Sequence, residues 1–207
     1  MANWRQNYGA LSANFAKAPN ICEASDQVAA AMAPPVVFVE CGTGVERVDG
    51  GSGVRQTKDR TSAFALARVD MRGGSASATF RPVFEGDYGY QIGVFPADLR
   101  LDSDTGSADG KRCALYVEAG SGGYAQVHCD GVESGATKVL GWRSGDTIKV
   151  DVTFKGSAAR VTLSAKGKTW SETLQGVPAC GLRFGAGLSD EKDSGVTVLA
   201  SSVDPVG

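Results

Sequence analysis

One stretch of the chain, residues 145–188, alternates between apolar and polar side chains over most of its length. Within residues 148–154 every second side chain is apolar, which is the two-residue period of a strand with one face on a core and the other in water. The pattern resumes at Val161 after a connection that contains Gly156, which predicts an antiparallel hairpin. Two further apolar runs predict strands at residues 182–188 and 196–199.

Four short motifs follow one another in a distinctive order: Tyr90–Val94, Gly145-Asp146, Gly176-Val177-Pro178 and Asp193–Leu199. This order is similar to that of SPRY domains, which are concanavalin A-like β-sandwiches used as interaction modules. The resemblance covers residues 36–203, with one departure: residues 78–83 read ATFRPV where the family usually has an aromatic-Glu-Val strand. It implies a sandwich that recognises a partner with the loops at one of its ends.

The charged residues nearly balance, with 21 Lys and Arg against 23 Asp and Glu, for a net charge of -2. Such a chain has no basic field to hold nucleic acid or an anionic membrane surface, and no apolar run is long enough for membrane insertion. Residues 1–15 lack the pattern of a secretory signal, and five cysteines without paired spacing favour reduced thiols. We therefore expect a soluble protein of the cytoplasm or another reducing intracellular compartment.

The first 35 residues differ in character from the rest of the chain. Apolar residues recur there every three or four positions, which predicts one stripe on a helix. The stripe consists of Trp4, Tyr8, Leu11 and Phe15. It could pack on the chain's own sandwich, dock on a partner, or belong to a disordered segment. We predict a partly helical N-terminal segment over residues 1–35 and a single β-sandwich over residues 36–207.

Between residues 36 and 95, short β-rich runs are separated by turns that contain glycine. The expected strands are 36–39, 64–69, 80–84 and 90–95. Pro82 lacks the N–H that a strand ladder needs, so its strand is expected at a sheet edge or with a bulge. Since no strand alternates with a long helix, the sequence favours an antiparallel all-β fold over a parallel α/β sheet.

Residues 113–129 contain two more alternating runs, which are joined by Gly120-Ser121-Gly122-Gly123. If the turn centres on Ser121, inward residues pair with inward residues, and Cys113 lies opposite Cys129. The two thiols would then be buried neighbours. We expect them to be reduced, and an oxidised cross-strand bridge is the alternative.

Few side chains are candidates for catalysis or metal binding. The single histidine, His128, alternates with Cys129 and so belongs to the solvent face, which predicts no catalytic residue and no enzyme. No Cys-x-x-Cys or His-x-x-x-His spacing indicates zinc. The segment that contains Asp102, Asp104 and Asp109 is rich in oxygen ligands, but it lacks the bidentate Glu that completes a calcium loop. A solvated turn has the same composition, so we expect no metal or cofactor, with a weak calcium site as the alternative.

A partner-binding surface is the best-supported site. The expected surface, in the loops at one end, contains Tyr88, Asp102, Asp104, Tyr124, Trp142 and Arg143. Trp and Arg are the residues most enriched in interface hot spots, and loops commonly carry binding residues. Trp142 could instead cap the open end of the core, whereas Trp170 is expected to pack inward.

The sequence therefore predicts an antiparallel concanavalin A-like β-sandwich of SPRY type with a short N-terminal helical segment. Its predicted function is non-catalytic recognition of a protein or peptide partner. Two alternatives are a carbohydrate-binding, lectin-like domain and a structural subunit of a larger assembly.

Overall fold

The computed structural model describes residues 36–59, 63–68, 71–84, 90–102, 114–118, 123–129, 132–188 and 193–204. For residues 114–118, 126–129 and 132–138 the description concerns the backbone. The predicted N-terminal helical segment, with its stripe of Trp4, Tyr8, Leu11 and Phe15, lies outside the described residues. So do Tyr88, Asp104 and Cys113.

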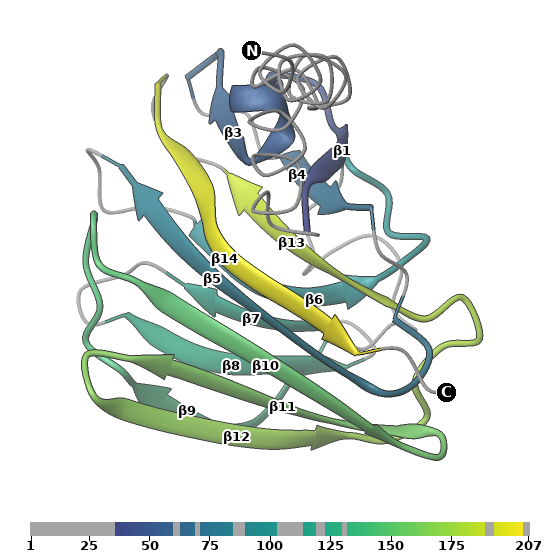
Figure 1. Cartoon of the computed structure of the whole chain (residues 1–207). Helices are drawn as coiled ribbons and strands as arrows, with labels where there is room; N and C mark the ends of the chain where they lie inside the picture. The colour runs from purple at the N-terminus through teal and green to yellow at the C-terminus, as the bar shows by residue number, and fades with distance from the viewer. Residues whose placement is uncertain are drawn as a thin grey trace, which may run out of the picture. The chain divides into compact units, whose positions relative to one another are not determined.

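In the described part of the chain, seven strands form one sheet, called the back sheet after its position in Figure 1. In spatial order they are β1 (Phe38–Cys41), β4 (Ala63–Ala67), β13 (Leu182–Leu188), β6 (Tyr90–Pro96), β7 (Ala114–Glu118), β8 (Tyr124–Cys129) and β9 (Val132–Val139). Every ladder between these strands is antiparallel. Because consecutive strands such as β4 and β5 belong to different sheets, the chain crosses between the two layers several times.

The front sheet also has seven strands, and its ladders are antiparallel too. In spatial order they are β12 (Lys168–Leu174), β11 (Ala158–Ala165), β10 (Ile148–Lys155), β5 (Ser75–Val83), β14 (Gly195–Asp204), β3 (Gly53–Gln56) and β2 (Val45–Val48). A 3-10 turn, Asp49–Gly51, joins β2 to β3. Among the described residues there is no helix long and apolar enough to cross a membrane.

The alternating stretch forms the hairpins that its sequence predicts. In β10 the side chains of Ile148, Val150 and Val152 are buried, while the residues between them face outward. The β11–β12 turn consists of Lys166 and Gly167, with φ angles of 51° and 73°. Positive φ at both positions is typical of the two-residue hairpin turns whose twist matches that of the strands, and Gly adopts it without steric cost.

The β7–β8 hairpin also has the predicted register. Ala114 pairs with His128 and Val117 with Ala125, so the hairpin is symmetrical about residue 121. Its turn therefore centres where the glycine-rich sequence placed it. The thiol pairing predicted for Cys113 and Cys129 falls outside the described residues.

The core between the two sheets is built around aromatic rings from both. Phe80 of the front sheet lies with its ring centroid 6.1 Å from that of Phe184 and 6.5 Å from that of Phe38, both from the back sheet. All three side chains are buried. Full burial of one such side chain stabilises the fold by about 1.5–3 kcal/mol. Trp170 is also buried and packs inward as predicted.

A second, smaller apolar cluster covers the outer face of the back sheet. Phe64 and Phe95 meet edge to face with their centroids 5.4 Å apart, and Leu99 and Leu101 pack over them. This covering explains why all five residues of β4 are buried, without the alternation of a half-exposed strand. Gly185 leaves the space for it, since a Cβ there would lie 2.7 Å from the Phe95 ring.

Of the two alternatives expected for the strand of Pro82, the edge position is wrong, whereas the β5–β14 ladder does have a register shift, between Val198 and Ala200. β5 lies between β10 and β14 and is not an edge strand. Pro82 is tolerated because the ladder to β10 ends at Phe80, so at Pro82 only β14 pairs with β5. The missing N–H is therefore compatible with an interior strand.

Candidate functional site

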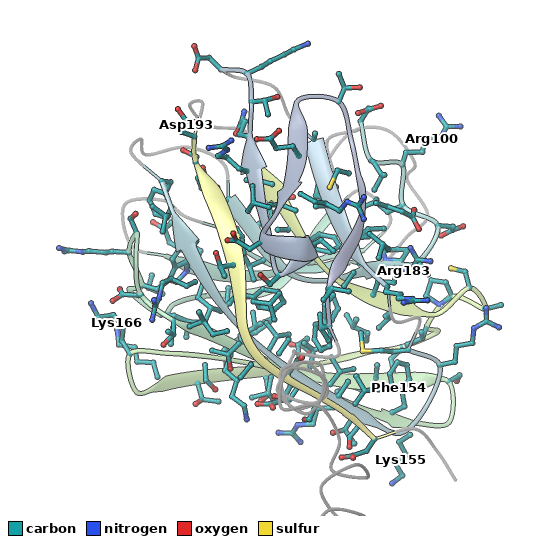
Figure 2. The ribbon with its side chains drawn as sticks, turned by 45° about the horizontal axis from the view of Figure 1, so that its top comes forward. Arg100, Phe154, Lys155, Lys166, Arg183 and Asp193 are labelled. Atoms are coloured by element: carbon teal, nitrogen blue, oxygen red, sulfur yellow. The ribbon has the colours of Figure 1, made fainter. Side chains whose placement is uncertain are left out.

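One end of the sandwich, called the Arg143 end, collects strand termini from both sheets. The cross-strand pairs Tyr90–Leu188 and Tyr124–Val139 close the back sheet there, and Val83–Gly195 closes the front sheet. The strand ends that border residues 84–89, 119–123, 140–147 and 189–194 therefore lie at this end. Figure 2 shows Lys166 and Asp193 at this end, and Phe154 and Lys155 at the opposite end.

A tight turn at residues 142–146 forms the centre of the Arg143 end. The Asp146 carboxylate accepts a hydrogen bond from the Arg143 backbone N–H at 2.7 Å, and the Asp146 N–H donates to the Arg143 carbonyl at 2.9 Å. The same carboxylate oxygen lies 3.2 Å from Lys166 Nζ. A short polar residue that bonds its own backbone in this way stabilises a turn.

Two further hydrogen bonds attach this turn to the end of β5. The Gly145 N–H donates to the Pro82 carbonyl at 2.7 Å. The Phe84 N–H donates to Ser144 Oγ at 2.9 Å. The turn is therefore held from both sides, and the position of its backbone is fixed relative to Val83.

Trp142 lies inside the core, at 2% exposure. Its ring meets Phe84 edge to face at 5.8 Å, and Phe84 stacks on Tyr90 at 4.8 Å. Trp142 therefore occupies the core-capping position that the sequence left as the alternative, and its ring is not available as a surface contact. Its Nε1 is buried without a hydrogen-bond partner among the described residues. Arg143, the next residue along the turn, is exposed.

The other expected surface residues do not all gather at this turn. Tyr124 is the first residue of β8, paired with Val139, and is half-buried, so it belongs to a strand and not to a loop. Asp102 accepts a hydrogen bond from the Thr43 N–H, which gives its carboxylate a structural role beside the β1–β2 turn. Tyr88 and Asp104 lie outside the described residues.

Three surface residues at the Arg143 end were missed by the sequence analysis. Val83 and Val139 are the most exposed large apolar residues of the described chain, at 53% and 45%. Arg81 is exposed two residues before Val83, on the same face of β5. The signal was present in the alternation, because Val83 continues the outward-facing set of β5, where a polar residue is usual.

The described residues contain scattered acidic side chains and two free thiols. No group of three or more His, Cys, Asp or Glu side chains within them is placed to hold a metal ion. Cys41 and Cys180 are free thiols. Burial raises the pKa of the Cys41 thiol, and the Arg47 guanidinium offsets part of that rise. The Cys180 thiol donates to Asp98 Oδ1 at 3.1 Å.

The two facing antiparallel sheets define a concanavalin A-like β-sandwich. Its fold is of the SPRY type: the SPRY domain of human HERC1 superposes with a TM-score of 0.59 over 78% of this chain and 96% of that one, at 16% identity. The TRIM65 PSpry domain gives 0.55 over 79% and 88%, at 11% identity. A legume lectin-like domain from Entamoeba histolytica gives 0.55 over 83% and 91%, at 10% identity.

No family model matches the sequence. No curated protein matches it either. The similarity to solved structures, all at low identity, therefore concerns the fold.

Proposed function

We propose that this chain is a non-catalytic interaction module that binds a protein or peptide partner with its Arg143 end. The SPRY-type fold supports an interaction role, because the SPRY domains that the sequence resembles are used as interaction modules. The proposed contact residues are Arg143 and the exposed residues of the same end, Arg81, Val83 and Val139. Trp142 is the buried support of the turn.

The observation that carries this proposal is the rigid presentation of Arg143. Its backbone is held by Asp146, the adjoining turn is bonded to β5, and the neighbouring Trp142 ring is anchored in the core. Presenting a side chain on a turn that is already ordered reduces the entropy lost on binding. An Arg held in this way is a typical hot-spot residue.

The test compares partner capture by wild type, Arg143→Ala and Arg160→Ala. Arg160 is the matched control, because it is an exposed arginine of β11 paired with Thr153, far from the turn. We expect Arg143→Ala to lose partners that Arg160→Ala retains, with cross-links located at the Arg143 end. An identical partner set for all three proteins would contradict the proposal.

Trp142→Ala is not suited to this test, although the sequence places it beside Arg143. Its ring is part of the core, so its removal would impair folding as well as any surface. Arg143→Ala removes an exposed side chain and leaves the turn's hydrogen bonds to the backbone in place.

A carbohydrate-binding role is the second candidate, and the legume lectin-like neighbour supports it at the level of the fold. A glycan array probed with and without chelator tests that role, and chelator-sensitive binding would favour it. The third candidate, a structural subunit held by Trp4, Tyr8, Leu11 and Phe15, is tested by deleting residues 1–18. Loss of assembly with an intact sandwich would favour it.

A further inference from the structure

Arginines and aliphatic residues alternate on the front sheet at the Arg143 end. Val83 is 53% exposed and Leu199 is 40% exposed. Arg81 precedes Val83 by two residues and pairs with Thr197, and Leu199 follows Thr197 by two residues, at the register shift between Val198 and Ala200. Arg143 adjoins Val83 through the bond from Phe84 N–H to Ser144 Oγ. These four residues, Leu199, Arg81, Val83 and Arg143, are called the basic stripe.

The two arginines of the basic stripe, Arg81 and Arg143, are exposed. Among the described residues, no carboxylate pairs with Arg81 or Arg143. Asp146 is the acid nearest to Arg143 along the chain, but its carboxylate already bonds the Arg143 N–H and Lys166. Asp193 lies near the start of β14, and its carboxylate is 3.7 Å from Arg55.

Two other basic residues of the front sheet form ion pairs within the chain. Lys149 pairs with Asp151 at 2.8 Å, and Arg55 pairs with Glu46 at 2.6 Å. Among the described residues, the basic stripe therefore has an excess of positive charge, on a protein whose net charge is -2. Such a local excess favours contact with an acidic partner and increases the rate of its association.

We propose that the basic stripe binds an extended acidic segment of a protein partner; this inference rests on the proposed function. Arginine suits this role, because its planar group can bond a carboxylate through two parallel N–H donors. Arg81 and Val83 are two strand residues apart, about 6.8 Å, which is also the spacing of alternate side chains in an extended peptide. One extended strand of the partner can therefore place a carboxylate on Arg81 and an aliphatic side chain on Val83. The next acidic residue of that strand then reaches Arg143.

The test selects random linear peptides displayed on phage against the full wild-type chain. Counter-selection uses Arg81→Gln/Arg143→Gln, which keeps much of each side chain's length but removes its charge. We expect the enriched peptides to have Asp or Glu two positions from an aliphatic residue. Replacing those acids by Asn or Gln, or using the double variant, should weaken binding about tenfold. Binding should also weaken with added salt, since the contacts are at the surface.

Arg160→Gln is the matched control, since it removes one exposed arginine from the same sheet at the other end. It should leave peptide affinity within about twofold of wild type, as expected for a charge beyond the screening length. Thermal unfolding of each variant checks that the fold is retained. A Val83→Asp variant adds a negative charge beside both arginines and should abolish binding of the acidic peptides.

The outcomes separate this inference from the proposed function. Enriched peptides without acidic residues, or peptides insensitive to the double variant, would overturn the acidic-partner inference. So would failure to enrich any sequence, or equal competition by heparin, which would indicate attraction to any polyanion. In each case, a protein partner that is lost specifically by Arg143→Ala would still support the proposed function. If Arg143→Ala retained every partner, the proposed function would be overturned as well.

Discussion

Gly123 lies so close to the Trp142 ring that a Cβ at position 123 would be 2.5 Å from Trp142 Cδ1. Its carbonyl also accepts hydrogen bonds from the N–H groups of Leu140 and Gly141, at 2.8 and 3.3 Å. Gly123 therefore positions the chain that leads into the turn and leaves room for the ring beneath it. Arg143 directly follows Trp142 in the chain, so the exposed position of Arg143 depends on this close approach.

Gly123→Ala should destabilise the protein more than Gly156→Ala. Both glycines have positive φ, 60° and 62°, so both substitutions carry the left-handed penalty of about 1–2 kcal/mol. Only Gly123 also meets a ring, because nothing lies within 4 Å of a Cβ at Gly156. The clash should add about 1–3 kcal/mol to the loss of unfolding free energy in urea. Equal losses for the two variants would contradict the close packing of Gly123 on Trp142.

Trp142→Ala should lower the unfolding free energy by about 3–5 kcal/mol, the range for removing a large buried aromatic side chain. Arg143→Ala, one residue along the same turn, should change it by less than about 0.5 kcal/mol, because its side chain is exposed. Chemical denaturation of the two variants beside wild type measures the difference. A small effect of Trp142→Ala would mean that its ring does not close the core.

The alternation of the sequence contained enough information for the hairpins. Residues 148–165 and 114–128 form the predicted antiparallel pairs, because a two-residue period and a glycine turn together determine both the buried face and the register. The inward position of Trp170 was expected from the size of its aromatic side chain. The hairpin pairings are local relationships, so a single sequence is sufficient to predict them.

Contacts between distant segments could not be predicted in this way. β13 and β14 follow each other in the chain but belong to different sheets, and alternation does not distinguish between the two layers. The continuous burial of β4 depends on Leu99 and Leu101, which cover it from outside the sandwich. At the candidate site, residue type indicated Trp142 and Arg143 together, whereas the turn directs one into the core and leaves the other exposed.

Asp146→Ala should destabilise the protein more than Lys166→Ala, although the two side chains form an ion pair. The Asp146 carboxylate also accepts the Arg143 N–H at 2.7 Å and is 29% exposed, so its loss should cost about 1–2 kcal/mol. Lys166 is 46% exposed and contributes the surface pair alone, worth about 0–1 kcal/mol. Urea unfolding of both variants tests this order, and equal costs would show that the ion pair dominates the turn.

Cys41 should make the folded state less stable relative to the unfolded chain as the solution becomes alkaline. Burial raises the pKa of its thiol above the ordinary value near 9.0, so the folded state keeps its proton to a higher pH than the unfolded chain does. As pH rises through the ordinary value, the unfolded chain ionises first and gains stability, and the unfolding free energy falls until the folded thiol also ionises. Below the ordinary value both states are protonated, and this contribution to the pH dependence disappears.

Unfolding free energies measured under reducing conditions, from neutral pH to about pH 10, should therefore fall more steeply for wild type than for Cys41→Ala. Parallel pH profiles for the two proteins would show that Cys41 ionises as readily in the fold as in the unfolded chain.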